Sequence, residues 1–335
     1  MLRLSLLAAL AALASTTAAA AEPPRVVTSI LPVHSLTASV MEGVGTPHLL
    51  VPQGASPHHF SMRPSDASAL QQADLVFWIG PAISAFLERP LSTLSGKAEV
   101  VTLINARGLN LLEIREGATF EAHDHDHGDH DDHAKKDDHD HDHARKDDHD
   151  GHGHDGHEHD RPEHVEPHIW LETGNAIVMA REIAEHLSEA DPANAATYKA
   201  NLERLTARLQ ALGAELTATL KPVAGRPFIV FHDAWQHFER QFGLTVAGSI
   251  TVGDEAGLGA RRISRLRSRI RELGAVCIFA EPQFDDRIVG TLADGADARV
   301  GIADPLGSRS AEPGPGLYEA SMREAAAAFR DCLAG

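Results

Sequence analysis

The chain has 335 residues, an apolar fraction of 43% and a formal net charge of −18, so it is long enough for two domains of ordinary size. The negative charge is concentrated, because residues 121–166 hold 18 acidic and 5 basic residues, and the remainder is only mildly acidic. Residues 261–271 carry six arginines, which we interpret as a solvated face of a helix, so nothing in the sequence indicates nucleic acid as a partner.

The first 21 residues have the pattern of a secretory signal peptide. Arg3 gives a positive start, an apolar run from Leu4 to Leu13 follows, and Ala19-Ala20-Ala21 fits the small-residue cleavage rule. The run is too short to span about 30 Å of hydrocarbon as a membrane anchor. We therefore expect residues 1–21 to be removed on export.

Residues 22–190 predict an N-terminal α/β lobe. Short apolar strands alternate with helical patterns there, which indicates parallel βαβ units. The expected strands are 26–31, 48–51, 75–79 and 100–104, and the expected helices are 32–41, 64–73 and 173–188.

A histidine- and aspartate-rich insert, residues 121–166, interrupts this lobe. Of the 22 histidines, 15 lie between His123 and His168, and the insert has almost no apolar residue. Such a composition cannot offset the entropy of ordering, so we expect a disordered loop. Its spacing of histidines predicts many weak zinc sites, which would collect zinc for the cleft or sense the periplasmic supply, and a solvated linker without that role is the alternative.

A long helix is expected to link the two lobes over residues 191–221. Asp191 is the expected N-cap and Pro192 the first helical residue. Leucines at spacings of three and four residues then continue to Leu220, before Pro222 ends the helix.

Residues 222–335 predict a second, C-terminal α/β lobe. The expected strands are 228–231, 244–247, 276–280 and 298–302, and the expected helices are 234–241, 263–273, 287–292 and 318–333. Cys277 and Cys332 are the two cysteines of an exported chain, which favours a disulfide over two buried thiols. The two lobes leave a cleft between them as the expected ligand site.

Candidate metal ligands follow strands in both lobes, where open α/β sheets bind ligands. His58 and His168 belong to the first lobe, and His232 and Asp304 to the second. Three imidazoles and one oxygen suit tetrahedral Zn²⁺, whereas manganese favours more oxygen ligands.

The sequence resembles the zinc-specific periplasmic binding proteins of the ZnuA type, within the metal-ion cluster of ABC substrate-binding proteins. The resemblance runs from Val26 to Leu333. It rests on the stretches VVTSI at 26–30, PQGAS at 52–56, LVFWIG at 75–80, FHDA at 231–234, FAEPQF at 279–284 and DPLG at 304–307, and on the histidine-rich insert.

The resemblance implies that His58, His168 and His232 bind Zn²⁺ as the transported ligand. It also implies the Cys277–Cys332 disulfide, a rigid linking helix and a periplasmic location. Relatives often have an acidic residue just before the first ligand, where this chain has Pro57. The fourth ligand is therefore open among Asp304, His59, Glu281 and water, and we favour Asp304 or water.

The expected function is to capture zinc and deliver it to an ABC permease and its ATPase. We expect a monomer that is not an enzyme, and a periplasmic zinc chaperone is a further expected partner. A manganese-type importer subunit and a zinc hydrolase are the alternatives. A hydrolase of the H-E-x-x-H type is disfavoured because the chain lacks that motif. The sequence is also compatible with a second role as a surface adhesin on the same fold. It does not specify the zinc affinity or the identity of the permease.

Overall fold

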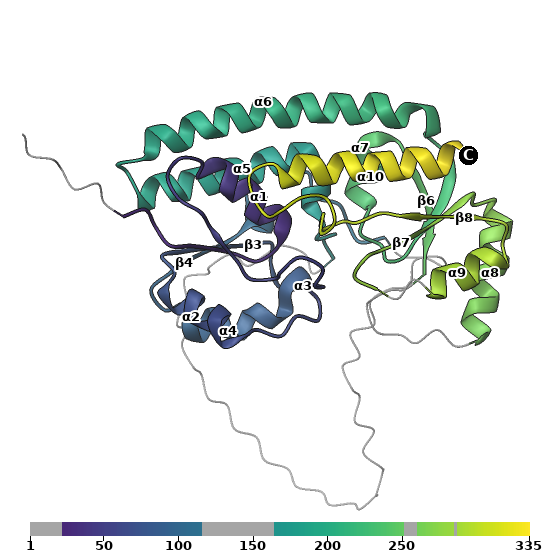
Figure 1. Ribbon diagram of the computed structural model, residues 1–335, viewed down its shortest axis with the longest axis horizontal. Helices are drawn as coiled ribbons and strands as arrows, with labels where there is room; N and C mark the ends of the chain where they lie inside the picture. The colour runs from purple at the N-terminus through teal and green to yellow at the C-terminus, as the bar shows by residue number, and fades with distance from the viewer. Residues whose placement is uncertain (1–21, 116–163, 251–259, 285–286) are drawn as a thin grey trace, which may run out of the picture.

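The computed structural model describes residues 22–115, 164–250, 260–284 and 287–335 (Figure 1). The predicted signal peptide and residues 121–163 of the predicted insert lie outside the described residues. Within the described ranges, no helix combines the length and the apolar character needed to cross a membrane.

The first lobe is built on a parallel sheet with the strand order β2-β1-β3-β4. Its strands are β1 (Val26–Thr28), β2 (His48–Leu49), β3 (Leu75–Trp78) and β4 (Glu99–Thr102). Its helices are α1 (Leu31–Val40), α2 (Pro64–Gln72), α3 (Pro81–Ser84), α4 (Glu88–Leu94) and α5 (Thr173–Ala190). Short 3₁₀ turns are η1 (Ala85–Leu87), η2 (Leu103–Asn105) and η3 (Ile169–Leu171). Every residue of β3 is buried, as expected for a central strand covered on both faces.

The second lobe repeats this topology, with the strand order β6-β5-β7-β8 and only parallel pairs. Its strands are β5 (Pro227–Val230), β6 (Thr245–Ser249), β7 (Cys277–Ala280) and β8 (Arg299–Ile302). Its helices are α7 (Gln236–Phe242), α8 (Ala260–Leu273), α9 (Arg287–Asp294) and α10 (Leu317–Ala334), with a 3₁₀ turn η4 (Lys221–Val223) before β5. In both sheets the carboxyl ends of parallel strands meet at one edge, which is where ligand-binding loops gather.

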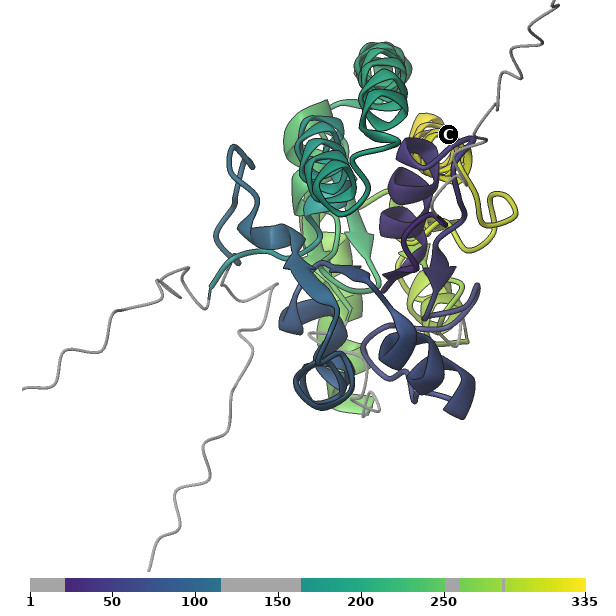
Figure 2. The same cartoon turned by 90° about the vertical axis from the view of Figure 1, so that its left-hand side faces the viewer.

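The lobes are joined by α6 (Ala195–Leu220), which lies along one side of both lobes (Figure 1). Its 26 residues span about 39 Å at 1.5 Å per residue. Figure 2 shows α6 nearly end-on, above α5 and beside α1 and α10. The apolar stripe of α6 is buried at Tyr198, Leu205, Leu209, Leu212, Leu216 and Leu220.

The C-terminal segment returns to the first lobe before it ends. Ser35 on α1 donates a hydrogen bond to the Gly314 carbonyl (2.8 Å) and accepts one from the backbone N–H of Tyr318 (2.9 Å). The Tyr318 hydroxyl in turn donates to the Trp170 carbonyl (2.7 Å). One hydrophobic core therefore runs through both lobes, and the lobes do not pack as independent bodies.

The fold confirms the predicted pair of parallel α/β lobes and the long connecting helix. The Cys277–Cys332 disulfide is also confirmed, and it fastens α10 to β7. The predicted start of the long helix is wrong, because Asn194 is its N-cap. Asp191 instead accepts hydrogen bonds from Asn194 and from the Tyr198 hydroxyl, each 2.8 Å long, and so closes the turn before the helix.

Candidate metal centre

His58 lies in the loop that connects β2 to α2. Gly54 has a φ of 82°, a left-handed conformation that glycine adopts without strain, and it turns the loop. The backbone N–H of His58 donates to the Ser56 hydroxyl (3.3 Å). The residue is half-buried, while the adjacent His59 is exposed.

His168 immediately precedes η3 and is held by Glu166. Its backbone N–H donates to both Glu166 oxygens (3.2 Å each), and its Nδ1 lies 2.5 Å from Glu166 Oε1. The next aromatic side chain, Trp170, donates from its indole N–H to the Pro305 carbonyl in the other lobe (2.8 Å). The His168 ring is therefore fixed in the interior, with 8% of its side chain exposed.

His232 follows β5 and is held by Glu281, which follows the neighbouring strand β7. The His232 backbone N–H donates to Glu281 Oε1 (3.2 Å), and its Nδ1 lies 2.6 Å from the same oxygen. The pairing of two parallel strands thus places a carboxylate beside a histidine that is 49 residues away in sequence.

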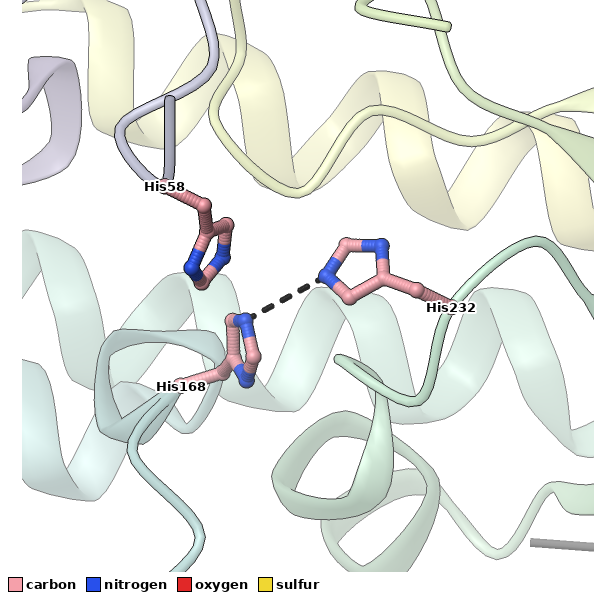
Figure 3. Close-up of side chains that lie close together, drawn as sticks. All are labelled: His58, His168 and His232. Carbon is pink, nitrogen blue, oxygen red and sulfur yellow. Dashed lines mark hydrogen bonds between the residues drawn. The ribbon is translucent and has the colours of Figure 1, made fainter. Parts of the chain in front are cut away.

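The three rings converge from three separate segments (Figure 3). One nitrogen from each of His58, His168 and His232 lies within 4.8 Å of the others. Nε2 of His232 is 3.3 Å from Nε2 of His168. Zn–N bonds of 2.0–2.1 Å in a tetrahedron place two ligand nitrogens about 3.3–3.4 Å apart. The spacing of these two rings is therefore already that of a tetrahedral zinc site.

The glutamates define which ring nitrogen is available to a metal. With its proton on Nδ1 directed at a carboxylate, an imidazole presents the lone pair of Nε2 to the ion. Burial raises the pKa of Glu166 to about 8, with His237 and the His168 backbone N–H acting in the opposite direction. A cation bound to the adjacent His168 would lower that pKa again and favour the carboxylate that accepts from Nδ1. Burial also raises the pKa of Glu281, and His232 opposes that shift.

A cavity of about 20 Å³ lies at the convergence of the rings. That volume accommodates about one water-sized body. The lining residues come from both lobes: Ser56, Pro57, His58, His168, Trp170, His232, Glu281, Gln283, Phe284, Pro305 and Leu306. Its size fits a single ion with at most a small additional ligand.

Asp304, the predicted fourth ligand, is not brought together with the three histidines. Its Oδ1 accepts from Gln283 Nε2 (2.9 Å) and the Leu306 backbone N–H (3.0 Å), and its Oδ2 accepts from the Ser308 hydroxyl (2.7 Å). The carboxylate is therefore used to close its own loop. The expectation that it coordinates the metal has no support in this geometry.

Glu166 was missed by sequence reasoning, which placed it in the disordered insert. In the structure, residues 164–166 return to the fold: the Glu166 backbone N–H donates to the Leu112 carbonyl (2.9 Å), and Val165 bridges to Glu113. The boundary of the insert at Glu166 is thus corrected. The only signal was its place two residues before a predicted ligand, a spacing that many acidic residues share.

Two histidines outside the cluster, His34 and His186, have structural surroundings. His34 Nε2 lies 3.1 Å from the Pro47 carbonyl inside the first lobe. His186 forms a second group with Glu99 and Glu189. That group lies on the surface, where His186 Nδ1 is 2.7 Å from Glu99. Exposed acidic groups of this kind are common without a metal ion, so this group is not taken as a metal site.

Comparison with known families gives one match along nearly the whole chain. The model of the family described as "Zinc-uptake complex component A periplasmic", ZnuA, matches residues 26–332. The high-affinity zinc uptake system protein ZnuA of Brucella abortus (strain 2308) is 45% identical over 94% of this chain and 93% of its own length. The protein of the same name from Paracoccus denitrificans (strain Pd 1222) is 39% identical over 94% and 93%.

Solved structures share the fold at lower identity. A zinc-bound ZnuA with residues 138–173 deleted has a TM-score of 0.69 and 22% identity, over 92% of this chain and 98% of its own. The periplasmic zinc-binding protein TroA of Treponema pallidum has a TM-score of 0.70 and 17% identity, over 93% and 99%. These likenesses bear on the architecture alone.

Proposed function

This chain belongs to the ZnuA family of periplasmic zinc-uptake components, and on that premise we propose that His58, His168 and His232 together hold the zinc ion that it carries. It is the zinc-binding subunit of an ABC importer, and it works with the permease and ATPase of that importer. The single observation that carries the site assignment is the convergence of three imidazoles from separate segments on one small cavity.

The ligand chemistry favours zinc over manganese. Nitrogen-rich tetrahedral sets suit zinc, whereas manganese prefers octahedral sets of carboxylate, carbonyl and water oxygen. The nearest carboxylates, Glu166 and Glu281, are hydrogen-bonded to the histidines and orient the rings. Such outer carboxylates also make the ring a better donor to the metal.

The fourth coordination position is assigned to a water molecule. Two buried oxygens on the cavity lining, Glu281 Oε2 and Gln283 Oε1, accept no hydrogen bond from the described residues. A zinc-bound water has two hydrogens to donate, and it would satisfy such acceptors. Asp304 is better explained as a residue that shapes the loop beside Gln283.

We propose that the protein binds zinc without catalysing a reaction, although a zinc-bound water can serve as a nucleophile in hydrolases. Zinc hydrolysis needs a base that accepts a proton from the metal-bound water. The glutamates beside the histidines orient the rings through Nδ1, and the H-E-x-x-H motif, whose glutamate is such a base, is absent from the sequence. Zinc release in stoichiometric amounts, with no turnover of generic ester and peptide substrates, is the expected result, and turnover that His232→Ala abolishes would establish a hydrolase.

The remaining parts of the proposal concern processing and partners. We place the cleavage after residue 21 and the first lobe at 22–190. The linking segment is 191–221, within which the helix itself is Ala195–Leu220, and the second lobe is 222–335. The protein acts as a periplasmic monomer, and a periplasmic zinc chaperone is proposed as an additional partner. Mass spectrometry and sedimentation of protein recovered from the periplasm test these points together.

Competitive titration with Zn²⁺ and Mn²⁺ tests the site itself. Zinc is expected to bind tightly at one site and to resist displacement by manganese. Asp304→Ala should change zinc affinity by no more than about twofold, the size of a substitution away from a functional contact. A large loss in Asp304→Ala would restore that residue as the fourth ligand. Equal competition by manganese would instead contradict the assignment of the metal.

A further inference from the structure

Two segments near the metal centre, residues 112–115 and 164–166, are joined by an isolated antiparallel bridge and form a short stem. The Ile114 backbone N–H donates to the His164 carbonyl (2.7 Å), and the Glu166 backbone N–H donates to the Leu112 carbonyl (2.9 Å). Glu113 and Val165 form the bridge between them. Glu166, which holds His168, is thus part of this stem.

The same stem is bound to the second lobe through Arg115. Its Nε donates to Asp233 Oδ2 (2.8 Å), a second guanidinium nitrogen donates to Asp233 Oδ1, and the third donates to Glu239 on α7. The Glu113 carbonyl accepts a further hydrogen bond from Gln236 Nε2 (2.8 Å). The guanidinium fork therefore engages two carboxylates of a segment that is 118 or more residues away in sequence.

These contacts are well protected from solvent. The exposed fractions of the side chains are 22% for Arg115, 21% for Asp233 and 10% for Glu239. Bidentate pairing of arginine with a carboxylate fixes both distance and orientation, and lysine cannot reproduce it. Partial burial makes the loss of one partner costly, because a carboxylate is then left desolvated.

This ion pair connects the segments that carry two of the proposed metal ligands, His232 and His168. Asp233 directly follows His232, and the stem that carries Arg115 also carries Glu166 beside His168. We propose that Arg115 is a positioning residue for the zinc site, which sets His232 against His168 by pinning the His232–Asp233 turn to the stem. This inference rests on the proposed function, since it concerns the same site.

Electrostatics alone predicts the opposite effect of removing Arg115. Deleting a positive charge near a dication should strengthen zinc binding, because like charges repel. Positioning predicts weaker binding, because the two Nε2 atoms would lose the 3.3 Å spacing that suits a tetrahedral ion. Loss of residues that orient metal ligands typically weakens binding by about 10–100-fold. The sign of the change therefore separates the two effects.

The test compares Arg115→Gln and Arg115→Lys with Arg208→Gln in the full mature chain. Arg208 is a matched control, since it donates from α6 to Glu319 on α10 (2.8 Å) and its helices supply no proposed ligand. Zinc affinity is measured by competition titration, and Tm is measured with and without zinc. A Co²⁺-substituted sample reports ligand geometry through its visible absorption.

We expect zinc affinity to fall by about 10-fold or more in Arg115→Gln and by less in Arg115→Lys, with an altered Co²⁺ spectrum. The zinc-induced rise in Tm should shrink in both variants and stay intact in Arg208→Gln. The Lys variant keeps one charged contact, so its affinity decides the question if the Gln variant fails to fold.

Unchanged or stronger zinc binding in the Arg115 variants, or an equal loss of Tm with and without zinc, would overturn the positioning role. Failure of the proposed function gives a different result. In that case His232→Ala itself would bind zinc as tightly as the unaltered protein, whatever the Arg115 variants do.

Discussion

The two halves of the metal centre differ in how they are held. His168 and His232 sit at fixed points of the fold, each with Nδ1 within 2.6 Å of a buried glutamate. His58 belongs to a half-buried loop between β2 and α2 that turns at Gly54. The first half already has a spacing that suits zinc, and the second half, His58, is the proposed ligand that lies on a loop.

Alanine substitution of the histidines should separate these halves by the largest margin. His168→Ala or His232→Ala is expected to weaken zinc binding by about 4 kcal/mol, or about a thousandfold, because each removes a ligand and leaves a buried carboxylate without its partner. His58→Ala should cost about a hundredfold, since water can replace a ligand that approaches from a loop. Competition titration of the three variants gives the order.

His34→Gln and His186→Ala serve as controls, because one histidine packs inside the first lobe and the other lies on the surface. Both should bind zinc as the unaltered protein does. An equal loss in all three ligand variants would remove the distinction between the two halves.

Lowering the pH tests the shared chemistry of the three rings. A protonated imidazole cannot donate a lone pair to zinc, and ordinary histidines titrate near pH 6.5. Each ring contributes about tenfold, so zinc affinity should fall by about a thousandfold between pH 7.5 and pH 5.5. Flat affinity over this range, measured with a competitor of known pH dependence, would argue against imidazole ligands.

The glutamates can be tested without touching a ligand. Glu281→Gln and Glu166→Gln keep the side-chain shape but replace a carboxylate acceptor by an amide, and we expect about 10–100-fold weaker zinc binding. The matched substitution Glu215→Gln removes a surface ion pair with Arg323 and should leave affinity unchanged. If the two buried variants behave like Glu215→Gln, the bracing of His168 and His232 has no role in binding.

The smallest effect on the tight site is expected from deleting residues 124–160. Apart from two alanines the deleted sequence has no apolar residue to add to a core, and its histidines are expected to supply only weak zinc sites. Total zinc bound should therefore drop while the tightest affinity is retained. Loss of the tight site in the deletion variant would mean that the deleted segment supports the position of His168.

The fold could be predicted from the sequence where the patterns are local. Alternation of short apolar runs such as Leu75–Trp78 with helical segments predicted both parallel sheets, and the leucine stripe of α6 predicted the long helix. The start of α6 was mispredicted because Asp191-Pro192 carries a capping signature, whereas Tyr198 recruits Asp191 through its hydroxyl. Tertiary contact overrode the local signal there.

The three histidines could be named from the sequence because the resemblance to the ZnuA type implied them, and the structure brings one nitrogen of each within 4.8 Å of the others. Their supporting groups could not be located, because Glu166 and Arg115 acquire their roles only when distant segments pair. Asp304 had as good a sequence position for a ligand as the histidines. Its hydrogen bonds to Gln283 and Ser308, which no sequence pattern shows, distinguish it from them.

Anomalous diffraction at the zinc edge, from crystals of the zinc-loaded protein, tests the central claim most directly. We expect one strong peak between the lobes, about 2.0–2.1 Å from Nε2 of His168, Nε2 of His232 and a ring nitrogen of His58. The fourth ligand should be a water within reach of Glu281 Oε2. A peak bonded to the Asp304 carboxylate, or one that lacks any of the three histidines, would contradict this account of the site.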